Sequence, residues 1–119
     1  MEVGIGLVAG GGGRDMAAPM LERVRAAWEE AGREGEPRLG SLAYLALGDE
    51  AARQGAENLK HYYGFLGGYA QMVADSMLTS GQAMRDSLRA FEAVGVTELY
   101  MDPAAASLDQ VDRLADAIA

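Results

Sequence analysis

The chain has 119 residues, about the length of one domain or less. A formal net charge of −8 and a single lysine, Lys60, argue against binding to nucleic acid or to an acidic membrane surface, because both require clustered basic side chains. The chain has no cysteine, which excludes disulfides and Cys-ligated metals and makes a cytoplasmic location the simplest expectation. No apolar run reaches the ~18 residues of a membrane span, and no basic segment precedes the first strand, so we expect neither a membrane anchor nor a signal peptide.

A glycine-rich connection follows the first apolar stretch. Residues 3–9 are continuously apolar apart from two glycines, which predicts a strand buried on both faces, as in a parallel sheet. Four consecutive glycines come next: Gly10, Gly11, Gly12 and Gly13. A strand, a glycine turn and a helix N-terminus can hold phosphate, because the backbone approaches the anion closely and free N–H groups point at it. The stretch lacks P-loop and GxGxxG signatures, and glycines are also plain turn formers, so spacing leaves both interpretations open.

The first helix is expected directly after these glycines. Asp15 is its predicted N-cap, and Pro19 must lie in the opening turn, which moves the expected start one or two residues beyond Asp15. Gly32 ends the helix. Five residues at helical spacing form the predicted buried face: Met16, Met20, Val24, Trp28 and Ala31.

The middle of the chain predicts a second strand and two helices. Residues 38–47 form the strand, and Gly48 and Asp49 then repeat the order of strand, glycine, N-cap and helix. Two glycines at 67–68 end or bend that helix, and a further short helix reaches about Leu78. One side of the longer helix carries five residues: Ala52, Ala56, Leu59, Tyr63 and Leu66.

The last third predicts a helix, a strand and a final helix. Thr79 as N-cap and Gln82 as N3 have capping-box spacing, Gly95 ends the helix, and residues 96–101 form the third strand. The helix buries three residues: Met84, Leu88 and Phe91. The pair Asp102-Pro103 stops the strand, and a second capping box then runs from Ser107 to Gln110. The final helix has the apolar stripe Val111, Leu114, Ala115 and Ile118.

Few side chains point to catalysis or metal binding. His61 is the only histidine and is expected on a helix surface, so we expect no metal site and leave catalytic residues unassigned. The serines lack the context of a hydrolase nucleophile. Asp102 lies where parallel α/β folds place active sites, with capping of the next loop as the alternative duty. An aromatic patch has packing or ligand contact as its two interpretations: Tyr62, Tyr63, Phe65 and Tyr69.

The alternation of strands and helices predicts one α/β domain over residues 1–119 with parallel strands. In order, the motifs GGGGRDM, ERVRAAWEEAGRE and RLGSLAYLALGD, followed by TSGQAMRDSLRAFEAVGVTELYMDP, resemble the C-terminal part of luciferase-like flavin-dependent monooxygenases. The resemblance implies an oxidoreductase that uses reduced FMN or a deazaflavin on a small organic substrate. It also implies a (β/α)₈ TIM barrel, of which this chain supplies about three parallel strands with covering helices. The cofactor phosphate maps onto Gly10 to Gly13, with Arg14 in place of the family's lysine or hydroxyl.

A three-stranded arc of a barrel has two open edges and an inner face with nothing opposite it. We therefore expect an exposed apolar inner face, and either a homo-oligomer or a missing N-terminal barrel portion. Two alternatives to a flavin enzyme remain at this point: a non-catalytic partial barrel that self-associates, and a small anion-binding α/β domain.

Overall fold

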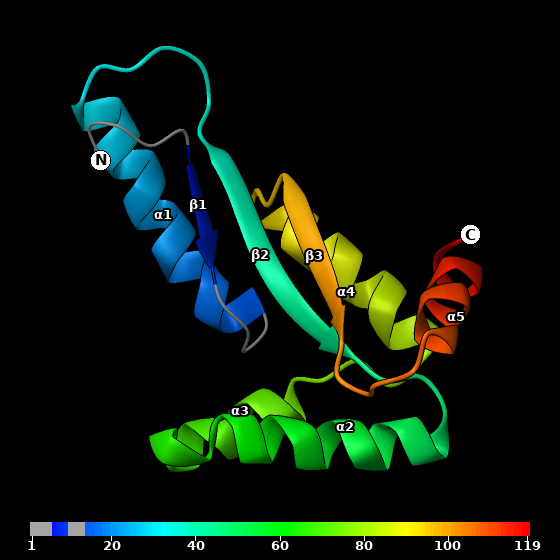
Figure 1. Cartoon of the computed structure of the whole chain (residues 1–119). Helices are drawn as coiled ribbons and strands as arrows, with labels where there is room; N and C mark the ends of the chain where they lie inside the picture. The colour runs from blue at the N-terminus through cyan, green and yellow to red at the C-terminus, as the bar shows by residue number, and fades with distance from the viewer. Residues whose placement is uncertain (1–5, 10–13) are drawn as a thin grey trace.

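The computed structural model describes residues 6–9 and 14–119. Strands and helices alternate along the chain as predicted (Figure 1). The elements are β1 (Gly6–Ala9), α1 (Arg14–Glu30), β2 (Arg38–Leu45), α2 (Asp49–Tyr62), the 3₁₀ turn η1 (Gly64–Leu66), α3 (Gly68–Asp75), α4 (Gly81–Ala93), β3 (Glu98–Pro103) and α5 (Asp109–Ile118). Among the described residues, none of the helices combines the length and the apolar character needed to cross a bilayer.

The described strands form one parallel sheet in the order β1-β2-β3, which confirms the predicted parallel pairing. Gly6 pairs with Arg38, and Gly40 pairs with Glu98. All carboxyl ends of the strands therefore meet at one edge of the sheet, called the carboxyl edge below. The outer sides of β1 and β3 are unpaired within this sheet, so it does not close into a barrel.

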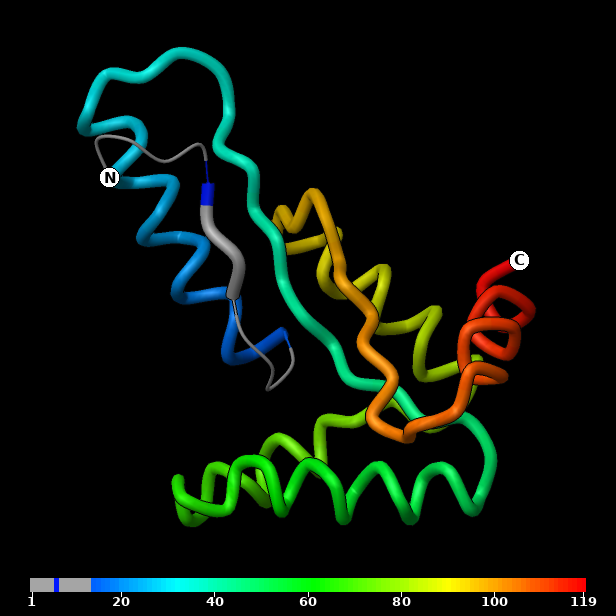
Figure 2. Tube along the Cα trace, in the orientation of Figure 1, coloured from blue at the N-terminus to red at the C-terminus, as the bar shows by residue number. Residues whose placement is uncertain are grey.

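Helices cover one face and the carboxyl edge of the sheet (Figures 1 and 2). Helices α1 and α4 pack on the same face through a cluster of Ala17, Leu21, Leu39, Ala43 and Phe91. Helices α2 and α3 lie across the carboxyl edge, where Leu59, Val73 and Ala74 form a separate cluster. A third cluster, Leu45, Leu47 and Met84, joins the end of β2 to α4 and is flanked by Leu114 and Ala117 of α5. Of the stripe predicted for α5, Val111 and Ile118 are instead exposed. None of the helices in the described part of the chain lies over the opposite face of the sheet (Figure 1).

Helix α1 differs from its prediction in start and in buried face. It begins at Arg14, before Asp15, and Pro19 lies in the second turn, so the expected later start is wrong. Pro19 lacks the N–H that would bond to the carbonyl of residue 15, a loss that packing of the helix on the sheet offsets. Met16 and Met20 are 40% and 43% exposed. Ala17 and Leu21 are buried in their place, whereas Trp28 is buried as predicted.

Both long strands end at residues other than those predicted. Strand β2 ends at Leu45 rather than at residue 47, because the chain then pairs with the segment before α4: the Ala46 N–H donates to the Leu78 carbonyl at 2.9 Å. Strand β3 runs from Glu98 to Pro103, so Asp102-Pro103 does not stop it. Pro103 is tolerated because β3 is an edge strand, where a missing N–H breaks no ladder bond on the open side.

The helix ends that glycine closes are confirmed, whereas the capping boxes are not. Gly32 and Gly95 have φ of +67° and +93° after α1 and α4, a backbone region that favours glycine. The N-cap of α4 is Ser80, whose Oγ accepts from the Ala83 N–H at 3.1 Å, and not Thr79. The Gln82 amide donates to Asp86 instead of closing a box.

Candidate functional site at the carboxyl edge of the sheet

The open face of the sheet carries a polar triad. On β2, Arg38 Nε donates to Glu98 Oε1 of β3 at 2.7 Å, and Tyr100 Oη donates to the other carboxylate oxygen at 2.7 Å. The Tyr100 hydrogen bond and then the Arg38 guanidinium hold the pKa of Glu98 below its usual range. Its two partners thus stabilise Glu98 as a carboxylate, and the pKa of Tyr100 is raised in return.

This triad corrects the expectation of an apolar inner face. Side chains alternate between the two faces of a strand, so Arg38, Glu98 and Tyr100 share the open face with Asp102. Their apolar neighbours in sequence, such as Leu39 and Leu99, point to the covered face and join its core. The described part of the open face is therefore largely polar, and Tyr100 remains 47% exposed there.

Tyrosines gather where the open face meets the carboxyl edge. The Tyr44 and Tyr63 hydroxyl oxygens lie 2.6 Å apart, and the Tyr63 ring makes edge contacts with the rings of Tyr44, Tyr62 and Tyr69. Burial and then the Tyr63 hydrogen bond raise the pKa of Tyr44 well above 10, so Tyr44 stays protonated at neutral pH. Of the predicted aromatic patch, Phe65 alone stands apart, with 80% of its surface exposed.

Asp102 is placed beside this tyrosine pair. It is the register partner of Tyr44, it is exposed, and its charge contributes to the raised pKa of Tyr44. Asp102 lies inside β3, one residue before the strand ends at Pro103, and capping of the loop that follows stays a prediction.

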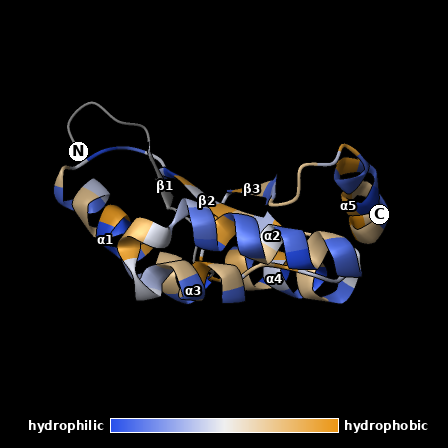
Figure 3. Cartoon of the chain, turned by 60° about the horizontal axis from the view of Figure 1, so that its bottom comes forward, coloured by the Kyte–Doolittle hydropathy of each residue, from blue (hydrophilic) through white to orange (hydrophobic). Residues whose placement is uncertain are grey.

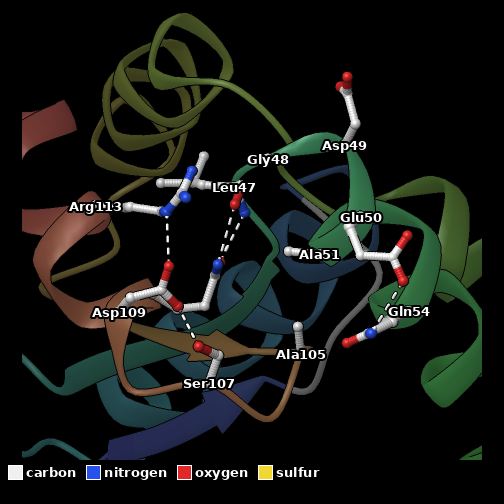
Figure 4. Close-up of a pocket in the computed structure, with 11 residues that line it drawn as sticks. Leu47, Gly48, Asp49, Glu50, Ala51, Gln54, Ala105, Ser107, Asp109 and Arg113 are labelled. Carbon is white, nitrogen blue, oxygen red and sulfur yellow. Dashed lines mark hydrogen bonds and ion pairs between the residues drawn. The ribbon is translucent and has the colours of Figure 1, made fainter.

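A cleft of about 470 Å³ opens between the starts of α2 and α5 (Figure 4). Gly48 is the N-cap of α2 and has φ +106°, a conformation that side-chain-bearing residues rarely adopt. The Arg113 guanidinium reaches toward it from α5, and Arg113 Nε also donates to Asp109 Oδ2 at 2.9 Å. The cleft is lined by Leu47, Gly48, Asp49, Glu50, Ala51, Gln54, Ala105, Ser107, Asp109, Gln110 and Arg113.

Gln110 fixes the floor of this cleft. It is 1% exposed, its Oε1 accepts from the Leu47 N–H at 2.7 Å, and its Nε2 donates to the Leu47 carbonyl at 3.0 Å. The Gln110 amide thus satisfies both backbone polar groups of Leu47, as a neighbouring strand would, and connects the segment between β2 and α2 to α5. The capping-box prediction assigned Gln110 to its own helix end, which is wrong. Its spacing of four and seven residues before Leu114 and Ala117 marked it as inward-facing.

The charges of the cleft disfavour a phosphate. Asp49, Glu50 and Asp109 contribute three carboxylates against the single guanidinium of Arg113. Arg53 lowers the pKa of Glu50, and Ser107 and then Arg113 lower the pKa of Asp109, so both are ionised at neutral pH. The cleft suits a neutral polar or a cationic group better than an anion.

Of the residues predicted to bind the cofactor phosphate, the structure describes only Arg14. Gly10, Gly11, Gly12 and Gly13 lie outside the described residues. Arg14 begins α1 at the carboxyl edge, with an exposed side chain whose guanidinium pairs with Asp15 at 3.0 Å. His61 is exposed on α2, as predicted. Within residues 6–9 and 14–119, no three His, Asp or Glu side chains lie close enough together to hold a metal ion.

The chain was compared with known protein families, curated proteins and solved structures. No protein-family model matches the chain, and a search of curated proteins finds no match either. Among solved structures, the chain is similar to an F420-dependent secondary alcohol dehydrogenase in complex with an F420-acetone adduct, with a TM-score of 0.69 and 13% sequence identity. The similarity covers 97% of this chain and 42% of that one.

This likeness shows the fold alone. The chain is an α/β unit that matches part of a TIM-barrel protein and spans less than half of its length. Because the match covers nearly all of the present chain, helices α2 and α3 at the carboxyl edge belong to the shared architecture. The three described strands form an open arc, and a closed barrel is not present among them.

Proposed function

We propose that this chain is the C-terminal portion of a flavin- or deazaflavin-dependent oxidoreductase of the luciferase-like monooxygenase family. The observation that supports this most is the fold match, since almost the whole chain superposes on part of a protein whose name states F420 dependence. The motif order of the sequence supports the same family. The match covers only 42% of the neighbour's chain. We therefore expect this chain to act on a small organic substrate only when the rest of a barrel is supplied.

The cofactor phosphate is assigned to the connection between β1 and α1. Helix α1 starts at Arg14, directly after the four glycines, which supports a role for its first N–H groups and for the Arg14 side chain in holding the phosphate. The Arg14 guanidinium would exchange its exposed partner Asp15 for the phosphate. The acidic cleft between α2 and α5 is the less suitable place for an anion.

When bound, the cofactor would supply the hydride or oxygen chemistry, and this chain would orient it. The Tyr44–Tyr63 pair would present a neutral phenol at the same edge, because the raised pKa of Tyr44 keeps its proton in place. Tyr100 and Glu98 would line the barrel interior below, already paired with Arg38. The chain would thus contribute binding and positioning groups.

The proposal is tested by fluorescence titration of the purified chain with FMN, with a deazaflavin carrying its phosphate, and with riboflavin as the phosphate-free probe. We expect the phosphorylated cofactors to bind more tightly than riboflavin. Arg14→Gln should reduce that advantage by tenfold or more, because a charged hydrogen bond contributes about 1.5–3 kcal/mol. Arg89→Gln, an exposed arginine on α4, is the matched control and should leave binding unchanged.

Three outcomes would count against the proposal in different ways. If no cofactor binds at millimolar concentration, this chain does not form a cofactor site by itself. Binding that Arg113→Gln weakens and Arg14→Gln does not would move the phosphate to the cleft. Phosphate binding without any flavin affinity would favour a small anion-binding domain.

A further inference from the structure

Asp102 is a carboxylate of the open face without a cationic partner in the described part of the chain. It takes part in none of the ion pairs found among residues 6–9 and 14–119. Arg38 shares the open face, but it lies six residues before Tyr44, the register partner of Asp102, which is about 20 Å along the strand. Arg38 is also already paired with Glu98. The charge of Asp102 is therefore left for a group from outside these residues.

Tyrosine side chains from β2 and from the end of α2 stand beside this carboxylate. Tyr44 faces it from the neighbouring strand, about 4.8 Å away at the backbone, and the charge of Asp102 contributes to the raised pKa of Tyr44. The Tyr63 hydroxyl oxygen lies 2.6 Å from that of Tyr44. The Tyr62 ring centroid lies 4.9 Å from that of Tyr63, and Tyr62 is 69% exposed. A ligand that meets Asp102 therefore also meets phenol oxygens and an accessible ring.

This set of groups favours an ammonium ion over an anion or a neutral alcohol. The two phenol hydroxyls use one hydrogen in their mutual bond, and their oxygens keep lone pairs that accept from a further donor. An ammonium group donates up to three hydrogen bonds, forms charge-assisted bonds with a carboxylate and is attracted to the faces of aromatic rings. An anion would be repelled by Asp102, and an alcohol would gain no charge interaction.

The tyrosines at the end of α2 are held in place by the packing of that helix on the strand ends. A Cβ on Gly55 would lie 3.0 Å from the Ala46 Cβ and 3.2 Å from the Ala104 Cβ, so α2 approaches both segments closely. The Asn58 amide donates to the Ala104 carbonyl at 2.9 Å. Figure 3 brings this edge forward and shows hydrophilic residues along the outward side of α2. Helix α2 thus forms a fixed support between solvent and the sheet.

We propose that Asp102, together with Tyr44, Tyr63 and Tyr62, binds the ammonium group of a small organic amine at the carboxyl edge. Asp102 forms the ion pair, the two phenol oxygens accept from the remaining N–H groups, and the Tyr62 ring supplies a cation–π contact. That this amine is the substrate rests on the proposed function, whereas its binding needs no cofactor.

The test is a titration of the isotope-labelled full chain, without cofactor, with phenethylammonium, phenethyl alcohol and phenylpropionate, which share one aromatic group and differ in charge. We expect phenethylammonium to shift the Tyr44 and Tyr63 ring resonances and to bind at least about tenfold more tightly than the alcohol. Asp102→Asn should weaken that binding at least about tenfold, because it removes the charge and keeps the shape. Asp116→Asn, the same change at an exposed aspartate of α5, is the control and should leave binding unchanged.

A second pair of variants tests the ring contact. Tyr62→Leu should weaken phenethylammonium binding about two- to fivefold, the size of an exposed cation–π contact. Phe65→Leu removes a ring that is 80% exposed on η1 and should have no effect. Because all of these positions are exposed, circular dichroism spectra that match the unsubstituted chain verify that each variant is folded.

Equal binding of the amine and the alcohol would overturn the proposal in favour of a neutral ligand. Equal losses from Asp102→Asn and Asp116→Asn would overturn it in favour of general attraction to a chain of net charge −8. No binding of any probe at millimolar concentration would overturn it as well. The amine titration contains no flavin, so it can succeed where the flavin titration fails, and the reverse.

Discussion

The two faces of the sheet differ in every respect that matters for this chain. The covered face is closed and largely apolar: Leu39, Ala43 and Leu45 are at most 7% exposed beneath α1 and α4. The open face carries Arg38, Glu98 and Tyr100, whose polar groups bond to one another. The covered face thus holds the fold together, whereas the open face is built to meet water or another polar surface.

The two faces of the sheet thus have different roles: the covered face stabilises the fold, and the open face is available for binding. Burial of apolar area is the main source of stability in a domain, and in this sheet it lies on one side. The polar side is left available for binding, together with the carboxyl edge and its cleft. Changes on the two faces should therefore have different consequences, and three experiments test this expectation.

The largest effect is expected from Leu45→Ala, compared with Leu42→Ala on the same strand. Leu45 is fully buried on the covered face, whereas Leu42 is half-buried on the open one. Truncation of a buried leucine costs about 2–5 kcal/mol, so Leu45→Ala should fall in that range and Leu42→Ala clearly below it. Urea unfolding measures both. Equal losses would mean that the open face is packed as tightly as the covered one.

An intermediate effect is expected from Gln110→Ala. The substitution leaves the Leu47 N–H and carbonyl without their buried partner, at a cost of about 1–3 kcal/mol. Gln82→Ala, which removes an exposed amide, should change the free energy of unfolding by less than about 0.5 kcal/mol. Thermal unfolding of the two variants measures the difference. Similar unfolding midpoints for Gln110→Ala and Gln82→Ala would show that the hydrogen bonds between Gln110 and Leu47 do not stabilise the fold.

The smallest effect concerns acid stability and Glu98. Because the folded pKa of Glu98 is lowered, its contribution is fully present above the unfolded value of about 4.3 and is lost as the pH falls through the folded value. Glu98→Gln should therefore flatten the loss of stability between about pH 5 and pH 3. Denaturant unfolding across that range is the measurement. An unchanged slope would mean that Tyr100 and Arg38 do not stabilise the carboxylate.

Much of the fold follows from local sequence signals. Strand-length apolar runs and glycines at helix ends are read over a few residues, and they predict the order of elements and the parallel sheet. The buried face of α1 could not be fixed in this way. Met16 with Met20 and Ala17 with Leu21 have the same spacing, so the contact with the sheet decides which pair is buried.

The candidate site was less accessible to prediction. The polar character of the open face is present in the sequence as alternation, because Glu98, Tyr100 and Asp102 are each separated by one apolar residue. The prediction of a strand over residues 96–101 assigned no face to these residues. The bond between Gln110 and Leu47 joins residues 63 positions apart, which no local pattern reveals. The glycine run and Arg14 remain a prediction from motif and resemblance.

In the proposed function, this chain is an arc of a barrel whose carboxyl edge holds a phosphate-bearing flavin or deazaflavin. The most direct test is chemical-shift mapping of the isotope-labelled chain during titration with FMN and with riboflavin. The account predicts that the phosphate-dependent shifts centre on Gly10 to Gly13 and Arg14, with further shifts at Tyr44 and Tyr63. Phosphate-dependent shifts confined to the covered face or to α5, or none at all, would contradict it.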